Sequence, residues 1–588
     1  MRGSSAFRAA IAPGGVLAGP WVKNELWRRA KAVPSLDLRF ADNKSLVDAV
    51  TGQSLITFTR ASSGMSTGSN GLINTATTNL LLRSQELATS PWFNANVTLT
   101  NNTGDTLDPV GGSTATKIAS SGTGAIGQAA VISTVSTGSI WLRTLSGTLN
   151  MSLIVYLSNS PFTNIGTANI TVTTNWQRFS VTTTNPPSAA SYNFQLNGIP
   201  AGTLYAWGAQ LEQSSTVGEY IPTTSTINSA PRFDHNPTTG ECLGLLMEEQ
   251  RTNLVTYSGC NANWSADFSA VYNLGLSALG IFSGVQVNSG GQIWHTIFRA
   301  GINLTGSTTY AFTAFYRAGT SGRARIVLRN NTLSTETVLA GPVGSLSTVS
   351  AVAGSVTVLS QYRWGDGLTY VVTGTFTPSN TSTDYWFRIG PDSATAGQTV
   401  IALGAQLEAG AFPTSYIPTT TATVTRSADV ASISGSNFSS WYRQDEGTVF
   451  AEFQTAVQDA ANNRGVTAVD DGTNNNRVSL FIPAGNFPLA VASRVVSGGV
   501  ASNPTNTGSI TSSSIAKSVI CYRVGTDGAA VSVNGAIPAA SSPASAPNGV
   551  NNLRIGTIFG TNNLGGTIKR LVFWPRRLGN EVLQEVTR

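Results

Sequence analysis

Hydrophobic and polar residues alternate in short stretches along almost the whole chain. Residues 35–40 read Ser-Leu-Asp-Leu-Arg-Phe, residues 55–60 read Leu-Ile-Thr-Phe-Thr-Arg, and residues 447–453 read Gly-Thr-Val-Phe-Ala-Glu-Phe. A period of two residues is typical of β-strands with one buried face. Turns rich in glycine and asparagine separate the stretches, so the pattern predicts an all-β chain of sandwich domains. Short helices are expected within residues 20–30 and after Gly579.

One long phrase occurs twice in the chain. Residues 208–212 and residues 404–408 both read Gly-Ala-Gln-Leu-Glu, and eight positions after each Glu begins the phrase Tyr-Ile-Pro-Thr-Thr. An internal repeat of this kind predicts that one structural unit is used twice. We expect the two copies, called module 1 and module 2, to span residues 79–226 and 253–424.

The other segments differ from the two copies. The predicted order is an N-terminal attachment segment (1–34), a short β leader (35–78), module 1 (79–226), a linker (227–252), module 2 (253–424) and a C-terminal β domain (425–588). An Ile-Asn pair at 73–74 is echoed at 227–228. Module 1 therefore looks like an insertion into a leader that would otherwise run directly to module 2.

Composition narrows the class of protein. Charged residues are only 11% of the chain while hydrophobic residues are 41%, which is not the composition of a disordered protein. The net charge of +6 is not gathered into a basic stripe, so no nucleic-acid partner is expected. No run of 18 apolar residues occurs, so membrane insertion is not expected. Three cysteines are too few for a disulfide framework, and no Cys/His spacing suggests structural zinc.

Few residues could carry catalysis. His235 and His295 are the only histidines, and Asp234 beside His235 fits a hydrogen-bonded linker turn better than an acid–base pair. Glycoside hydrolysis needs two carboxylates across one sugar site. Glu212 and Glu408 belong to different copies of the repeat, so each is expected to hold a corner of its own module. The chain is therefore predicted not to be an enzyme.

The N-terminal segment carries aromatic and basic residues on a stretch too short to fold alone. Trp21, Trp27, Arg28 and Arg29 fit anchors that dock on a partner, because interfaces are enriched in aromatic residues and arginine. The alternative is that the two tryptophans fold back on the next domain.

The end of the chain resembles the last strands of concanavalin A-like (laminin G-like) lectin sandwiches. There a Gly-x-Ile strand runs into an aromatic strand and a short Leu/Glu segment, as in residues 565–574 and 578–583. The two modules look like carbohydrate-binding jelly-roll modules of bacteriophage tail and fibre proteins, and phrases such as 231–235, 248–254 and 425–429 are similar to that group. The resemblance covers residues 35–588. It implies two tandem jelly-roll β-sandwiches followed by a concanavalin A-like sandwich.

The same resemblance implies a role. The chain would be a phage virion structural protein, a tail or head fibre or adhesin, in which the N-terminus contacts other virion proteins and the sandwiches bind host-surface polysaccharide. A homotrimer is the usual fibre assembly in such proteins. The alternatives are a polysaccharide-degrading tailspike-type enzyme and an architectural decoration protein without a ligand.

Sugar sites in β-sandwiches combine an aromatic face with polar side chains in loops, so turns and domain edges are the expected places for ligand residues. Trp364, flanked by Tyr362 and Asp366 in a turn-rich stretch, is the predicted exposed glycan-binding residue. Trp441 at the start of the C-terminal domain fits ligand contact and interdomain packing equally. No cofactor is expected, although the resemblance allows calcium in the C-terminal domain, where 470–472 read Asp-Asp-Gly.

Overall fold

The computed structural model describes residues 24–588 except for short gaps. The gaps are 185, 187, 456, 458, 486–489, 505–508, 544, 559 and 561. The chain forms two compact units. One unit comprises 59–65 and 75–231, and the other comprises the residues up to 58 together with 66–74 and 232–588. Among the described residues, no helix is long and apolar enough to cross a membrane.

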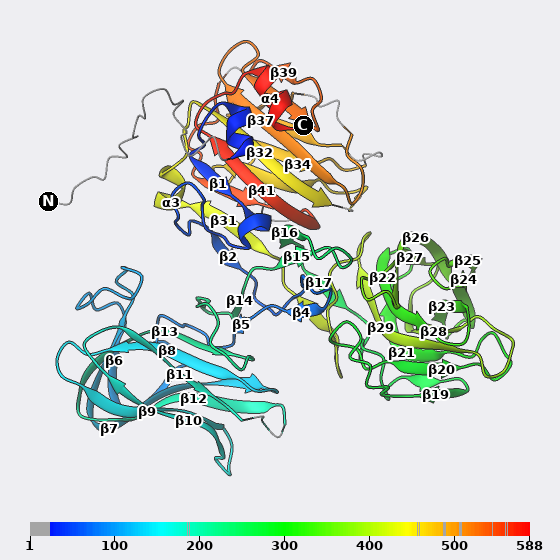
Figure 1. The fold of residues 1–588 in the computed structure, drawn as a ribbon, viewed down its shortest axis with the longest axis horizontal. Helices are drawn as coiled ribbons and strands as arrows, with labels where there is room; N and C mark the ends of the chain where they lie inside the picture. The colour runs from blue at the N-terminus through cyan, green and yellow to red at the C-terminus, as the bar shows by residue number, and fades with distance from the viewer. Residues whose placement is uncertain are drawn as a thin grey trace, which may run out of the picture. The chain divides into compact units, whose positions relative to one another are not determined.

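Module 1 lies in the smaller unit and is built on one eight-stranded sheet that folds into two layers (Figure 1). The strand order is β10 (Asn164–Val172), β9 (Leu149–Leu157), β12 (Ala190–Ile199), β7 (Thr116–Ile132), β13 (Gly202–Glu212), β8 (Thr137–Arg143) and β11 (Gln177–Thr182), with β6 (Phe93–Thr100) beside β7. The long strand β7 pairs with β13 through its first half and with β12 through its second half. The core between the layers includes Leu142, Leu153, Phe194 and Leu211.

Module 2 is a sandwich of two six-stranded sheets (Figure 1). The first is β18 (Ser265–Ala266), β21 (Ile297–Leu304), β28 (Ser382–Pro391), β23 (Arg323–Asn330), β24 (Thr335–Pro342) and β25 (Ser347–Ala351). The second is β19 (Ser269–Val271), β20 (Val285–Asn288), β29 (Thr399–Ala409), β22 (Tyr310–Ala318), β27 (Thr369–Pro378) and β26 (Gly354–Arg363). Large side chains such as Trp264, Phe312 and Phe387 fill the core between them.

The C-terminal sandwich has an eight-stranded and a seven-stranded sheet. The first is β15 (Phe233–His235), β16 (Cys242–Met247), β41 (Gly566–Trp574), β32 (Glu446–Thr455), β37 (Ile515–Arg523), β38 (Ala529–Val533) and β39 (Ala539–Ser541), with β1 (Leu36–Leu38) on β41. The second is β2 (Thr57–Thr59), β31 (Val430–Ser434), β40 (Asn552–Ile555), β33 (Arg464–Asp470), β34 (Arg477–Ile482), β35 (Ala492–Ser497) and β36 (Val500–Ser502). Smaller elements are α2 (Phe40–Asn43), α3 (Gly435–Ser439) and the paired strands β3 (Met65–Thr67) with β4 (Ile73–Thr75), β5 (Thr78–Asn79) with β14 (Asn228–Ser229), and β17 (Arg251–Asn253) with β30 (Val424–Arg426).

The predicted all-β, multi-sandwich fold is confirmed, and the two expected helices are present. Helix α1 (Glu25–Ala30) begins where the Asn24 side chain accepts the Trp27 amide N–H at 3.2 Å. Helix α4 (Asn580–Val586) follows Gly579. Both helices bury apolar residues in a small cluster with outward-facing residues of β32, β37 and β41. The eight-stranded sheet therefore has a core on each face.

Strands from the predicted leader and linker, namely β1, β2, β15 and β16, are part of the C-terminal sandwich. Leu36 and Leu38 of β1 pair with β41, and β16 pairs with the same strand on its other end. Gly244 of β16 approaches β41 so closely that a Cβ would lie 2.1 Å from the Ile568 carbonyl oxygen. Because strand pairing joins residues hundreds of positions apart, the sequence boundaries at 35–78 and 227–252 could not reveal which parts of these segments join this sandwich. Residues 59–65, 75–78 and 227–231 instead belong to the smaller unit.

The repeated phrase is the sequence of a buried hydrogen-bonded corner, as expected for Glu212 and Glu408. In module 2, the Gln406 side chain accepts the Ile417 N–H at 2.7 Å and donates to Glu408 at 3.0 Å. In module 1 the same bonds join Gln210 to Ile221 and to Glu212 at 2.8 Å each. All four polar side chains are at most 1% exposed. The prediction that they hold a fold corner is confirmed.

Each corner is closed by one buried asparagine. In module 1, Asn79 accepts the N–H groups of Leu81 and Leu211 and donates to the carbonyls of Ala209 and Ile221, at 2.9–3.2 Å. Asn253 makes three of the four equivalent bonds in module 2.

Replacing Asn79 by alanine is expected to lower the free energy of unfolding of the smaller unit by about 2–4 kcal/mol, because buried backbone groups lose their partners. Differential scanning calorimetry of the full chain would measure it. Asn175, an exposed asparagine of the same module, is the matched control, and Asn175→Ala should leave the transition in place. Equal effects of the two substitutions would contradict the assigned role of Asn79.

Candidate functional site

The predicted glycan-binding tryptophans are both buried. Trp364 is 7% exposed, and its indole N–H donates to the Gly71 carbonyl at 2.7 Å. Trp441 is 5% exposed and packs edge-on against Phe438 and Phe573. The structure therefore corrects the expectation of an exposed ring at Trp364, and it places Trp441 in packing.

The turn around Trp364 was identified correctly, but it packs against another segment. Tyr362 stacks on Trp364 at 6.1 Å and keeps 39% of its surface exposed. Asp366 accepts from Thr369 and from Arg317, at 2.7 and 2.8 Å. A Cβ on Gly365 would lie 1.6 Å from the Pro237 carbonyl oxygen. A turn in sequence does not reveal that a distant segment covers it.

Of the four residues predicted to anchor the N-terminal segment on a partner, the three that the structure describes lie in different environments. Trp21 lies outside the described residues. Trp27 is 7% exposed and donates to the Asp37 carboxylate at 2.9 Å, so the expectation that it docks on a partner is corrected to the fold-back alternative. Arg29 reaches the carbonyl of Arg588 at 2.8 Å, whereas the Arg28 side chain is exposed. The attachment role predicted for Arg28 and Arg29 stays a prediction.

The residues considered for catalysis and for calcium serve local structure. His235 is buried with Nδ1 2.9 Å from the Thr67 carbonyl oxygen, and Asp234 accepts the Thr67 N–H at 2.7 Å. Burial raises the pKa of Asp234. Asp470 accepts from Arg554 at 2.6 Å. Among the described residues, no group of three His, Cys, Asp or Glu side chains could hold a metal ion.

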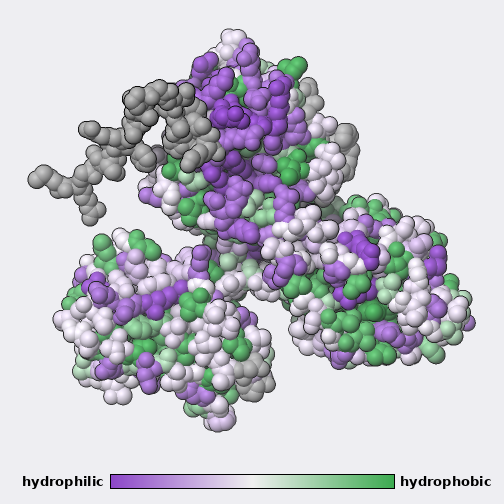
Figure 2. Space-filling model, viewed as in Figure 1, coloured by the Kyte–Doolittle hydropathy of each residue, from purple (hydrophilic) through white to green (hydrophobic). Residues whose placement is uncertain are grey.

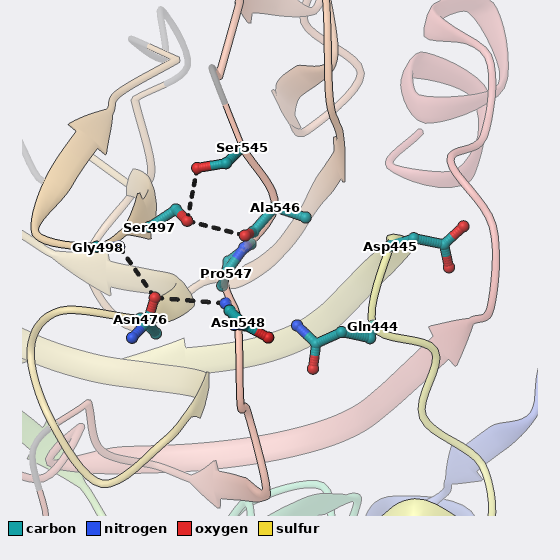
Figure 3. Close-up of a pocket in the computed structure, with 9 residues that line it drawn as sticks. All are labelled: Gln444, Asp445, Asn476, Ser497, Gly498, Ser545, Ala546, Pro547 and Asn548. Atoms are coloured by element: carbon teal, nitrogen blue, oxygen red, sulfur yellow. Dashed lines mark hydrogen bonds between the residues drawn. The ribbon is translucent and has the colours of Figure 1, made fainter.

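A pocket of about 650 Å³ lies between loops of the C-terminal sandwich (Figure 3). Asn476 accepts the N–H groups of Gly498 and Asn548, and the Ser545 hydroxyl donates to Ser497 at 2.7 Å. These bonds connect the loops to one another rather than pointing polar groups into the pocket. Its lining contains no aromatic residue that could stack on a sugar ring.

The C-terminal sandwich also has the broadest hydrophilic area in the view of Figure 2. A small groove of about 140 Å³ in this domain has charged residues of both signs in its lining, namely Glu25, Arg29, Glu452, Lys517 and Arg570. Arg29 is paired with Glu25, and Arg570 with Asp37 at 2.7 Å. Since both arginines already have carboxylate partners, the groove shows no preference for a ligand of one charge.

The outer face of the first sheet of module 2 combines aromatic and charged side chains, which sequence analysis missed. We call the aromatic face the group of Phe298, Trp386 and Arg388 on β21 and β28 together with Phe268 and Trp294, which lie in the loops before β19 and β21. The rings of Phe298 and Trp386 stack with centroids 4.4 Å apart and planes 5° apart. Phe268 is 59% exposed and Trp294 is 50% exposed. Large exposed aromatic surface of this kind is uncommon away from binding sites.

Trp294 and Phe268 are held in place by a buried histidine. His295, 6% exposed, stacks on Phe268 at 4.9 Å and meets Trp294 edge-on at 4.4 Å. Its Nδ1 accepts the Gly290 N–H at 2.7 Å, which fixes the ring orientation. Both exposed rings thus have packing contacts without a ligand, and such preorganisation lowers the entropic cost of binding.

Arg388 connects the two aromatic pairs. Its guanidinium donates to the Asp267 carboxylate, to Glu336 at 3.0 Å and to the Trp294 carbonyl at 3.3 Å. Its Cζ lies 5.8 Å from the Phe298 ring and 5.9 Å from the Trp386 ring. The face therefore presents stacking surface beside carboxylate and guanidinium groups.

The sequence contained a weak signal for this face. Residues 385–387 read Tyr-Trp-Phe, an apolar run in which periodicity cannot tell the buried face from the exposed one. Only the structure shows that Tyr385 and Phe387 enter the core while Trp386 lies on the other side.

No protein-family model matches the chain, and no curated protein matches it. Solved structures are similar at low identity. The tandem CBM22 domains of Xyn10C from Paenibacillus barcinonensis are 12% identical over 57% of this chain and 98% of their own, with a TM-score of 0.20. Domains LG4-5 of the mouse laminin α1 chain are 11% identical over 49% of this chain and 87% of their own, with a TM-score of 0.17. A variant of NanB sialidase from Streptococcus pneumoniae is 15% identical over 26% of each chain, with a TM-score of 0.21. Similarity at this level carries no inference about ligand or activity.

Proposed function

We propose that this chain is a non-catalytic carbohydrate-binding protein and that module 2 contacts the sugar through its aromatic face. The observation that carries the proposal is the pair Trp294 and Phe268, half exposed yet fixed by the buried His295. Sugar rings present C–H groups that stack on aromatic faces, and their hydroxyls bond to nearby polar side chains. Asp267, Glu336 and Arg388 supply such polar groups at the same face.

Hydrolysis of the bound sugar is not part of the proposal. A glycosidase needs one carboxylate to give a proton and another to act on the opposite side of the bond. Asp267 and Glu336 both accept hydrogen bonds from Arg388, so each is engaged in holding that side chain. The tailspike-type alternative is therefore the weaker one.

The setting of this activity is proposed from the sequence resemblance alone. In this proposal the chain is a structural protein of a phage virion, a tail or head fibre that binds host-surface polysaccharide, assembles as a homotrimer and contacts other virion proteins through its N-terminus. Arg28, whose side chain is exposed, is one described residue that we propose takes part in that last contact.

The test uses the full chain in native affinity electrophoresis against a panel of neutral and acidic polysaccharides, followed by adsorption to host cells. Retarded migration with at least one polymer is expected. Release of reducing ends from the same polymer would favour the enzyme. No retardation by any polymer, together with unstable particles when the gene is deleted, would favour the decoration protein and remove the proposal.

A further inference from the structure

The two copies of the module carry different side chains at matching positions of one strand. In β12 the core residues Tyr192, Phe194 and Leu196 alternate with Asn193 and Gln195. In β28 the core residues are Tyr385, Phe387 and Ile389, and they alternate with Trp386 and Arg388. Each strand lies between matching neighbours, β7 and β9 in one copy, β21 and β23 in the other. The outer faces are therefore equivalent in position but not in chemistry.

In module 1 this face is uncharged throughout. Strands β6, β9, β10 and β12 and residues 124–132 of β7 contain no Asp, Glu, Lys or Arg. The matching strands of module 2 contain seven, namely Arg299, Arg323, Arg325, Arg329, Glu336, Asp384 and Arg388. We call the module 1 surface the amide face, after Asn193, Gln195 and Asn197.

Side chains of the amide face form a chain of hydrogen bonds along the sheet. The Tyr156 hydroxyl donates to Gln195 at 2.8 Å, and Gln195 donates to Asn197 at 2.9 Å. Phe162 meets Tyr156 edge-on at 6.3 Å and is 68% exposed. An ordered amide row beside an exposed ring is the combination that binds sugar hydroxyls and stacks on sugar rings.

Asn193 offers a further amide beside this row. It is 8% exposed, it lies on the outer side of β12, and its side chain makes no hydrogen bond among the described residues. The amide is open to solvent at this face, so it can donate to and accept from the hydroxyl groups of a ligand.

A groove of about 430 Å³ lies at one end of the face. Its polar lining comes from Asn150, Ser152, Asn169, Thr171 and Asn197. Asn169 is exposed, and its side chain forms no hydrogen bond within the described part of the chain. The groove continues the amide row, because Asn197 pairs with Ser152 across β12 and β9.

We propose that the amide face of module 1 is a second carbohydrate site and that it takes an uncharged polysaccharide. An acidic sugar would bring a carboxylate to a face with no cation to pair it, whereas hydroxyl groups match free amides. This inference rests on the proposed function in assuming that the modules bind sugars. It adds that module 1 and module 2 bind sugars of different chemistry.

The test is affinity electrophoresis of the full chain with galactomannan, β-glucan and dextran as uncharged probes and polygalacturonate, alginate and hyaluronate as acidic ones. We expect retardation by at least one uncharged probe, reduced at least tenfold in affinity by Phe162→Ala and by Asn193→Ala. Trp294→Ala, in module 2, should leave that retardation unchanged. Val110→Ala, at a 77% exposed aliphatic residue of module 1, is the matched control and should also leave it unchanged.

Calorimetry separates binding from folding. Because the Asn193 side chain has no partner within the described part of the protein, Asn193→Ala should not lower the melting temperature of the smaller unit. If it does lower it, the effect of Phe162→Ala on binding alone tests the inference. Retardation only by acidic probes, or retardation by uncharged probes that survives both module 1 substitutions, would overturn this inference. Uncharged binding that depends on Phe162, with no binding that depends on Trp294, would instead remove the proposed role of the aromatic face and leave this inference standing.

Discussion

Replacing Glu248 by glutamine is expected to lower the free energy of unfolding of the larger unit by about 3–5 kcal/mol, since breaking a buried ion pair leaves uncompensated charge behind. The Glu248 carboxylate lies 2.8 Å from the Arg232 guanidinium and 3.0 Å from that of Arg426. It also accepts the N–H and the hydroxyl of Ser415 at 2.6 Å each. The side chains of both arginines are at most 1% exposed. A glutamine amide would place N–H donors against two buried cations.

The same site predicts a pH dependence. Burial alone would raise the pKa of Glu248, but Arg426 and Arg232 outweigh it and lower the pKa from 4.5 to about 2. A carboxyl whose folded-state pKa is depressed contributes stability that is present above the unfolded value. That contribution is lost as the pH falls from about 4.5 to about 2. Stability of the wild-type unit should therefore fall across this window, and the Glu248→Gln variant should lack this component.

Glu408 provides the matched control because it is just as buried but has the opposite shift. Burial raises the pKa of Glu408, despite hydrogen bonds from Thr414 and Gln406. Its protonation therefore adds stability that is full below pH 4.5 and lost as the pH rises through the folded-state pKa. Glu408→Gln should cost clearly less than Glu248→Gln at neutral pH. Guanidinium denaturation at pH 7 and at pH 3 would measure both, and equal losses at pH 7 would contradict the role given to Glu248.

This ion-pair network gives a structural role to two sequence phrases that otherwise indicate only a resemblance to phage proteins. Residues 231–235 contain Arg232, and residues 248–254 begin with Glu248. Arg232 also pairs with the buried Asp429 at 2.5 Å, and Glu248 reaches Ser415 at the end of the repeated corner of module 2. Charged residues next to turns are ordinarily solvated, so nothing in the sequence indicates that these are buried. Their partners lie up to 197 positions away in the chain.

The sequence predicted what depends on local pattern and on the repeat. Alternation gave the strands, and identical phrases gave the buried corners at Gln210 and Gln406. It failed where the result depends on which side of a strand or turn is covered. Trp364 sits in a turn that another segment covers, while Trp386 sits in an apolar run yet lies on the outer face. Covering by distant segments is a tertiary property, which is why the exposure of Trp364 was predicted wrongly and the outer position of Trp386 was not predicted.

Replacing Trp294 by alanine is expected to weaken binding of the polysaccharide held by module 2 by about thirtyfold, or roughly 2 kcal/mol, the loss typical when a central tryptophan is removed from an interface. The indole is 50% exposed in the free protein, and its edge rests on His295 at 4.4 Å. A sugar ring stacked on it would bury apolar surface without ordering a flexible side chain. Trp294→Phe keeps an aromatic face and should recover part of the affinity.

Stability should hardly change, because half of the Trp294 surface is already in water and no described side chain depends on its indole N–H. Leu359 of β26 is the matched control, since it is also 50% exposed but belongs to the other sheet of module 2. Isothermal titration with a polymer whose retardation of the wild-type chain persists in Phe162→Ala would give the dissociation constants, and calorimetry would give the melting temperatures. Unchanged affinity in Trp294→Ala, or an equal loss in Leu359→Ala, would show that the aromatic face is not where module 2 holds its ligand. A fall in affinity for Trp294→Ala alone, at constant melting temperature, would show that the exposed indole serves binding rather than folding.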